Sequence, residues 1–248
     1  MMRHSILMAA LLLCWSVAAQ AKPPALAGII AQHTEARGGA EAIEAVEAIR
    51  VKLEIVEPTF TVTGEYVATR NGFMRIDIFA GGNRVFTEAL GPEGGWQMFA
   101  DGRIEGLSED EKKALEHGII SNLYGLHERE NFGYTLALAD AIELDGKTYI
   151  GVVETAPDGF EKTLFLDPAN YLIVRSMEVS ALHPDIDPAK QQFVTVNSDF
   201  NTFDGRVFSD AEEKHDRNTG EIVQRSRVTE RVINPTLDRQ IFLKPVSK

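Results

Sequence analysis

The sequence has almost no cysteine, and its one cysteine lies near the N-terminus. Cys14 sits within an apolar run from Ile6 to Val17. Arg3 precedes this run, and Ala19-Gln20-Ala21 follows it with the small residues that signal peptidase accepts, so we expect a cleavable bacterial secretory signal peptide over residues 1–21. Cleavage after about Ala21 leaves a mature chain without thiols, which excludes disulfides, thiolate nucleophiles and cysteine-ligated metals.

Long apolar stretches are absent after this segment. The run from Ile6 to Val17 is shorter than the roughly 20 apolar residues that a membrane-spanning helix needs, and no later stretch approaches that length. Leu11-Leu12-Leu13 also differ from the small residue that precedes an acylated cysteine, so Cys14 is not expected to carry a lipid anchor. We therefore predict a diffusible protein, not embedded in a membrane, that is exported to the periplasm.

Positive charge is scarce as well. Lys and Arg number 25 against 37 Asp and Glu, which gives a formal net charge of −12. This balance provides no basic surface for nucleic acid or anionic membranes, and neither is expected as a partner. Hydrophobic residues at 44% and charged residues at 25% are typical of a globular protein. No linker divides residues 22–248, which predicts a single domain.

The patterns that mark common enzymes and metal sites are missing from the sequence. We find no Gly-x-Ser-x-Gly, His-Glu-x-x-His or phosphate-loop motif, and the histidines of the mature chain are scattered one per element. Asp185 and Asp187 lie in a proline-bounded loop, but two carboxylates fall short of a calcium site. We therefore expect no enzyme activity, no cofactor and no metal.

The sequence does contain a long series of alternating apolar segments. Helical periodicity extends over Ala25–Arg37, breaks at Gly38-Gly39 and resumes over Ala40–Ile49. The period then changes to two, and turn pairs such as Asn71-Gly72 and Asp145-Gly146 separate the segments, which indicates hairpins. The pattern predicts an α+β protein, mostly antiparallel β, with about eleven strands.

A helix interrupts the strands in mid-chain. Ser108 and Glu111 form a capping-box pattern for a helix that we expect to extend from Ser108 to Leu126. Its apolar face carries Leu115, Ile119, Ile120, Leu123 and Tyr124. Such a helix can be a movable lid or plug over a cavity, or a fixed cap on a closed core, and both alternatives predict the same apolar face.

This layout resembles that of the LolA/LolB superfamily of periplasmic lipoprotein carriers and its exported relatives. The resemblance rests on the signal peptide, the segment EARGGAEAIEAVEAIRV and the strand series broken by one apolar helix, from about Ala25 to Leu243. It implies an incomplete, half-open β-barrel around an apolar cavity, with helices as a lid. Such carriers also use an arginine to control opening, and Arg70, Arg75 and Arg84 all lie in the relevant part of the sheet.

The leading hypothesis is a non-enzymatic periplasmic carrier for a lipid or the acyl chains of a lipoprotein. Such a carrier needs an apolar concave surface, since each exposed CH₂ group costs about 0.8 kcal/mol. Trp96, Met98 and Phe99, on the strand before the helix, are candidates for the cavity wall together with the apolar face of the helix, although core packing explains any single one of them. The alternatives are an envelope protein-interaction or sensor module without lipid cargo, and an exported hydrolase with an unfamiliar site.

Overall fold

The computed structural model describes residues 25–144, 146–184 and 187–246. The proposed signal peptide over residues 1–21 and Asp185 therefore lie outside the described residues. The strands are β1 (Ala48–Glu57), β2 (Phe60–Thr69), β3 (Met74–Ala80), β4 (Asn83–Gly91), β5 (Gly94–Phe99), β6 (Ile104–Gly106), β7 (Thr135–Leu144), β8 (Lys147–Thr155), β9 (Glu161–Leu166), β10 (Ile173–Ser180), β11 (Gln191–Phe203), β12 (Arg206–Asp216) and β13 (Ile222–Ile233). The helices are α1 (Leu26–Ala36), α2 (Ala40–Glu44), α3 (Glu109–Leu123) and the short 3₁₀ helices η1 (Leu126–Phe132) and η2 (Arg239–Phe242).

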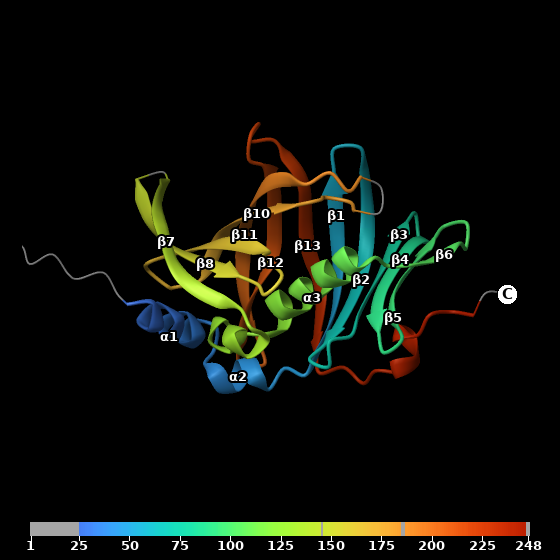
Figure 1. Ribbon diagram of the computed structural model, residues 1–248, viewed down its shortest axis with the longest axis horizontal. Helices are drawn as coiled ribbons and strands as arrows, with labels where there is room; N and C mark the ends of the chain where they lie inside the picture. The colour runs from blue at the N-terminus through green and yellow to red at the C-terminus, as the bar shows by residue number, and fades with distance from the viewer. Residues whose placement is uncertain (1–24, 145, 185–186, 247–248) are drawn as a thin grey trace, which may run out of the picture.

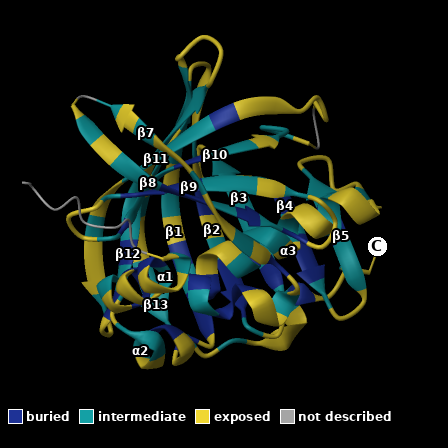
Figure 2. Cartoon of the chain, turned by 60° about the vertical axis from the view of Figure 1, so that its left-hand side comes forward, coloured by how far each residue is buried: buried dark blue, intermediate teal, exposed yellow. Residues whose placement is uncertain are grey.

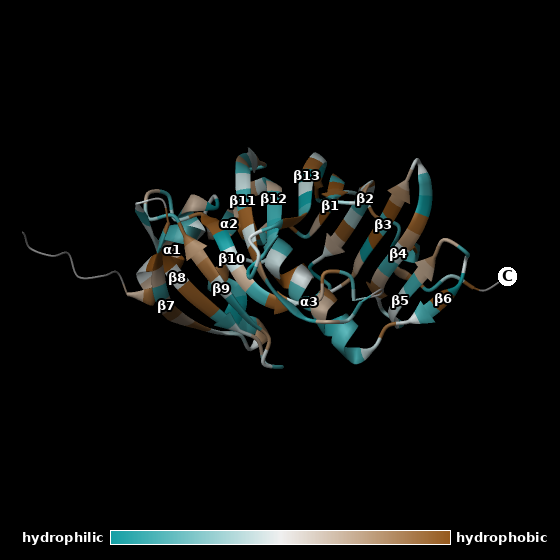
Figure 3. Ribbon diagram, turned by 90° about the horizontal axis from the view of Figure 1, so that it is seen from above, coloured by the Kyte–Doolittle hydropathy of each residue, from teal (hydrophilic) through white to brown (hydrophobic). Residues whose placement is uncertain are grey.

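All the described strands join one antiparallel sheet. Its order is β6-β5-β4-β3-β2-β1-β13-β12-β11-β10-β9-β8-β7, so every pair of neighbouring strands is consecutive in sequence except β1 and β13. In the described chain β6 and β7 are the two edges of this sheet, which curls around α3 without closing (Figures 1 and 3). The predicted fold class, a mostly antiparallel α+β protein with an incomplete barrel, is confirmed.

The structure corrects three details of the expected layout. Among the described residues the sheet has 13 strands instead of about eleven, and the added β6 is a three-residue strand too short to show an alternating pattern. The second helical segment ends at Glu44, well before Ile49, because Ala48 and Ile49 already pair with β2. The mid-chain helix ends at Leu123, and η1 begins at Leu126.

The helix α3 begins as the sequence predicts. The backbone N–H of Glu111 donates to Ser108 Oγ at 3.3 Å, and the backbone N–H of Ser108 donates to Glu111 Oε2 at 2.6 Å, which completes the capping box. Two donors at the helix N-terminus are thereby satisfied. No helix among the described residues is long and apolar enough to cross a membrane.

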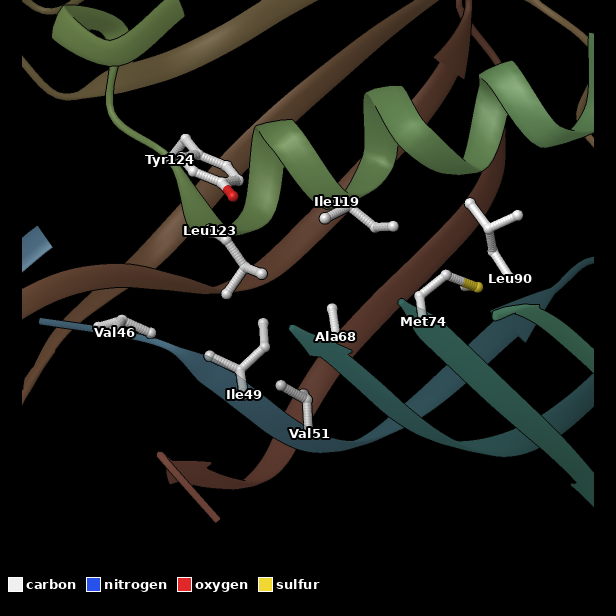
Figure 4. Close-up of a cluster of buried hydrophobic side chains, with 9 residues drawn as sticks. All are labelled: Val46, Ile49, Val51, Ala68, Met74, Leu90, Ile119, Leu123 and Tyr124. Carbon is white, nitrogen blue, oxygen red and sulfur yellow. The ribbon is translucent and has the colours of Figure 1, made fainter. Parts of the chain in front are cut away.

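Two clusters of buried side chains attach the helices to the sheet. The first joins α3 to β1–β4 and consists of Val46, Ile49, Val51, Ala68, Met74, Leu90, Ile119, Leu123 and Tyr124 (Figure 4). The second joins α1 and η1 to β8 and β9 and consists of Ile29, Leu126, Val152, Leu164 and Leu166. Figure 2 shows buried residues gathered at the end of the sheet that the helices cover, whereas the loops at the other end are exposed.

Candidate functional site

A cavity of about 1500 Å³ lies between α3 and the concave face of the sheet. It exceeds the roughly 300–1,000 Å³ of most small-molecule pockets. The central strands contribute an apolar wall that contains Ile49, Val51, Leu53, Tyr66, Ile76 and Val228. The facing wall, from β9 to β12, adds the charged residues Lys162, Glu178, Asp210, Glu212 and Lys214. Figure 3 shows hydrophobic residues recurring along β1–β3. The cavity is therefore amphipathic.

The helix α3 turns its small and polar residues toward this cavity. Ala114, His117, Gly118, Ser121 and Asn122 are among its lining residues. The five candidate residues of the helix are placed elsewhere: Ile119, Leu123 and Tyr124 belong to the first buried cluster, and Leu115 and Ile120 pack against it. Figure 4 shows Ile119 and Leu123 pointing at the sheet. As ligand-binding residues these five stay a prediction, which requires α3 to move off the sheet.

The other three candidates lie on β5, on both of its faces. Trp96 is 1% exposed, and its indole Nε1 donates to the Phe242 carbonyl at 3.0 Å, so it packs under η2 on the outer face. Met98 shares that face by alternation. Phe99 lies on the other face and contacts the ring of Phe86 at 5.7 Å between centroids. Among the described residues that line the cavity, none of these three is found.

Three arginines hold the C-terminal end of α3, which the sequence did not single out as a group. Arg70 Nη2 donates to the Leu123 carbonyl at 3.2 Å, Arg129 Nη1 to Ile120 at 2.6 Å, and Arg206 Nη1 and Nη2 to Leu123 and Asn122 at 2.8 and 2.9 Å. The last carbonyls of a helix lack intrahelical donors and carry partial negative charge, so cations stabilise them. The helix is thus fixed at this end, whereas its N-terminal cap is exposed.

Of the three arginines considered from the sequence, Arg70 is the one that contacts α3. It also donates from Nε to Val46 and from Nη2 to Ile43, and its guanidinium lies 4.2 Å from the centroid of the Tyr124 ring. Arg75 and Arg84 instead pair with Asp77. The sequence could not show which of these arginines contacts α3, because the contact depends on where each side chain lies in the folded sheet.

A buried carboxylate completes the Arg70 site. Glu128 Oε1 lies 2.6 Å from Arg70 Nη1, and the side chains are 9% and 13% exposed. Burial opposes ionisation of Glu128, but the hydrogen bonds from Arg70 and from the Gly125 backbone hold its pKa below its usual value. The pair therefore stays ionised and links β2, η1 and the end of α3.

On the other side of the cavity, His117 connects α3 to the turn between β8 and β9. Its ring stacks on Phe160 at 4.6 Å between centroids, and its Nε2 lies 3.1 Å from Asp158 Oδ2. Its Nδ1 contacts the hydroxyl of Tyr134. Hydrogen bonds from the Phe160 backbone and from His117 hold the pKa of Asp158 below its usual value. These contacts are exposed or half-buried, so they form a second attachment of α3, weaker than the arginine anchor.

His33 lies at the deep end of the cavity and is neutral. It is 1% exposed, and its Nδ1 lies 2.8 Å from the Tyr171 carbonyl oxygen, so the ring donates from that nitrogen. Burial, followed by the nearby charge of Arg37, lowers its pKa from 6.5 to about 3.

We expect His33 to make the fold weaker in acid. The unfolded chain takes up a proton near pH 6.5, which the folded chain resists until about pH 3, so the free energy of unfolding should fall across that window. His33→Gln keeps an amide donor for Tyr171 and removes the titration. Its stability should depend less steeply on pH, by up to about 1.4 kcal/mol per pH unit. Urea denaturation across this range measures both slopes, and identical slopes would contradict the assignment.

Known proteins resemble this chain in structure and not in sequence. No family model and no curated protein matches it. Similar solved structures include a DUF1329 family protein from Desulfovibrio piger, with a TM-score of 0.58 and 12% identity over 87% of this chain and 95% of that one. A putative outer membrane lipoprotein-sorting protein domain from Vibrio parahaemolyticus has a TM-score of 0.57 and 11% identity over 86% of this chain and 94% of its own.

A LolA superfamily protein from Nitrosomonas europaea is similar to the same extent. Its TM-score is 0.57 at 12% identity, over 87% of this chain and 96% of that one. Identities this low establish the fold alone. The chain therefore has the LolA-like fold that the resemblance in sequence layout predicted. Within the described residues, no group of three or more His, Cys, Asp or Glu side chains is placed to hold a metal ion.

Proposed function

We propose that this protein is a periplasmic carrier that shelters an amphiphilic lipid, or the acyl chains of a lipoprotein, between α3 and the sheet. The observation that carries the proposal is the amphipathic cavity, which combines an apolar wall on β1–β3 and β13 with charged and apolar side chains on β9–β12. An acyl chain on the apolar wall would gain about 0.8 kcal/mol for each CH₂ removed from water. A polar headgroup would face charged side chains of the lining.

The contacts of α3 support a lid that swings about its C-terminal end. The arginines hold that end through the carbonyls of residues 120–123, whereas the part of α3 before Ile120 is attached by side-chain packing and by the His117 contacts. Displacement of this part would add the apolar surface under Leu115 and Ile119 to the cavity and lengthen the site for an acyl chain. In the carriers that this fold resembles, an arginine controls opening, and Arg70 is the candidate for that role here.

An interaction module without lipid cargo is the weaker proposal for this fold. Such a module would need an interior filled by its own side chains, and the cavity of about 1500 Å³ argues against that. The similar lipoprotein-sorting and LolA superfamily structures favour a carrier over an enzyme.

We expect lipid to accompany the protein from its native envelope. The full chain, secreted and purified from a bacterial periplasm without detergent, should release lipid into an organic extract, as measured by mass spectrometry. After removal of that lipid it should bind a fluorescent fatty acid. Ile76→Lys, on the apolar wall, should weaken that binding about tenfold or more, because a desolvated ammonium costs over about 1.4 kcal/mol.

The matched control is Leu138→Lys on the edge strand β7. Leu138 is 52% exposed and is not among the residues that line the cavity, so this variant should bind the fatty acid as the wild type does. A protein that releases no lipid and binds no fatty acid would contradict the carrier.

A further inference from the structure

The deep end of the cavity carries an excess of buried positive charge. Arg37 follows α1, Arg129 comes from η1 and Arg231 from β13, and all three line the cavity. Arg206 lies behind them on β12 and is 0% exposed, while the side chains of Arg129 and Arg231 are 6% and 5% exposed. The whole chain has a formal net charge of −12, so this local cluster of positive charge has the opposite sign to the chain as a whole.

Carboxylates balance two of these four arginines. Arg129 Nε lies 3.0 Å from Glu154 Oε2, and Arg231 Nη2 lies 2.8 Å from Asp210 Oδ1. Within the described residues, Arg37 and Arg206 have no carboxylate partner. Arg37 Nε donates to the Val207 carbonyl at 2.7 Å, and Arg206 donates to the carbonyls at the end of α3. Two positive charges are therefore uncompensated at this end of the cavity.

Several donors of these arginines also lack acceptors. The buried Nε atoms of Arg206 and Arg231 have no hydrogen-bond partner. In the part of the chain that the structure describes, no residue accepts a hydrogen bond from Nη1 or Nη2 of Arg37, which faces the cavity. Natural proteins leave few buried donors unsatisfied, and such groups need an explanation. An acceptor that enters the cavity would supply one.

The pKa values of the two uncompensated arginines agree with a missing negative charge. Burial, reinforced by the charges of Arg129 and Arg231, lowers the pKa of Arg37 to about 10. Burial, reinforced by Arg37 and Arg70, lowers the pKa of Arg206 to about 8. An arginine in water keeps its proton far above these values. The surroundings of both side chains thus disfavour their positive charge. An incoming anion would stabilise the charged form of both arginines.

Phe208 holds three of the guanidinium groups together. Its ring is nearly buried, and the guanidinium carbons of Arg231, Arg206 and Arg37 lie 4.2, 4.7 and 5.9 Å from its centroid. A cation–π contact orients a guanidinium without neutralising it. The N–H forks remain suited to a tetrahedral or planar oxyanion, which arginine recognises through paired hydrogen bonds.

We propose that the deep end of the cavity binds a phosphate-type oxyanion through Arg37 and Arg231, with Arg206 supplying charge from behind. The proposal rests on the carrier function where the oxyanion is the headgroup of a lipid whose chains follow the apolar wall. A free phosphate would engage the same groups without any chain. The bound oxyanion accepts hydrogen bonds from Nη1 and Nη2 of Arg37 and compensates the positive charge of the arginine cluster.

Two lipids that differ only in the phosphate test this site. Dioctanoyl phosphatidic acid, dioctanoylglycerol and inorganic phosphate are titrated separately into the delipidated full chain by calorimetry. We expect phosphatidic acid to bind about tenfold or more tightly than dioctanoylglycerol. Arg37→Met should bring the ratio of the two dissociation constants close to one. Arg103→Met removes an exposed arginine just before β6 that does not line the cavity, and it should keep the wild-type ratio.

Each outcome of this titration separates the oxyanion site from the carrier function. Equal binding of both lipids by the wild type would overturn the oxyanion site and leave the carrier in place. Binding of inorganic phosphate and phosphatidic acid at equal strength, with no binding of dioctanoylglycerol, would support the site and contradict the carrier. Absence of binding by all three probes would overturn both. The wild-type comparison decides the matter even if Arg37→Met does not fold.

Discussion

Replacing Arg70 with methionine is expected to lower the free energy of unfolding by about 3–5 kcal/mol, because it leaves Glu128 buried without its cation. The substitution also removes the donors to the carbonyls of Ile43, Val46 and Leu123. Since Leu123 ends α3, the helix should detach more readily from the sheet. Urea denaturation measures the stability, and hydrogen exchange over residues 119–124 measures the detachment of the helix.

Arg75→Met is the matched control for Arg70→Met. Arg75 lies in β3 and, like Arg70, is a half-buried arginine with a carboxylate partner, here Asp77. Unlike Arg70, it donates to the Ile241 carbonyl on the outer face of the sheet. Its loss should reduce stability without raising exchange in α3. Equal exchange of α3 in the two variants would contradict an anchoring role for Arg70.

Acidification gives a second signature of the Arg70–Glu128 pair. The hydrogen bonds to Glu128 lower its pKa in the folded protein, so its contribution is present at neutral pH and is lost as the pH falls through the folded pKa. The stability gap between wild type and Arg70→Met should therefore narrow from about pH 7 to about pH 4. Arg70→Met combined with Glu128→Gln should recover part of the loss at neutral pH, since the buried charge is gone.

Elements that depend on residues close in sequence could be predicted. The capping box of Ser108 and Glu111 spans three residues, and the alternating segments and their glycine turns are equally local. The LolA-like arrangement followed from the order of these elements. Strand β6 was not predicted because three residues show too little periodicity. The helix predicted over Ala40–Ile49 begins where α2 does but ends too late, because the pairing of Ala48 and Ile49 with β2 decides that boundary.

The site depends on contacts between residues that are far apart in sequence, and this part could not be predicted. Arg70 and Glu128 are 58 residues apart, and Arg37 and Val207 are 170 apart. Alternation in β5 separates Trp96 from Phe99 but does not say which of them faces α3. The apolar face of α3 was identified correctly as a face, yet the structure packs it on the sheet and gives the cavity the other side of the helix.

Ile119→Asp should distinguish a movable α3 from a fixed one. Ile119 is 2% exposed among the side chains that join α3 to the sheet, so an aspartate there would lose its hydration. A helix that can leave the sheet avoids this cost by undocking, and the loss of stability is limited to the free energy of docking. We expect the variant to keep the circular dichroism of the sheet, to become sensitive to protease near α3 and to lose the fluorescent fatty acid.

Val152→Asp supplies the matched control for a buried position that cannot undock. Val152 is 0% exposed on β8, in the second buried cluster, and its strand pairs with β7 on one side and β9 on the other. An aspartate there should cost at least the roughly 2–5 kcal/mol typical of core disruption and unfold the whole sheet. Global unfolding of Ile119→Asp to the same extent would make α3 a fixed cap, because a helix that could move would have left the sheet before the strands separated.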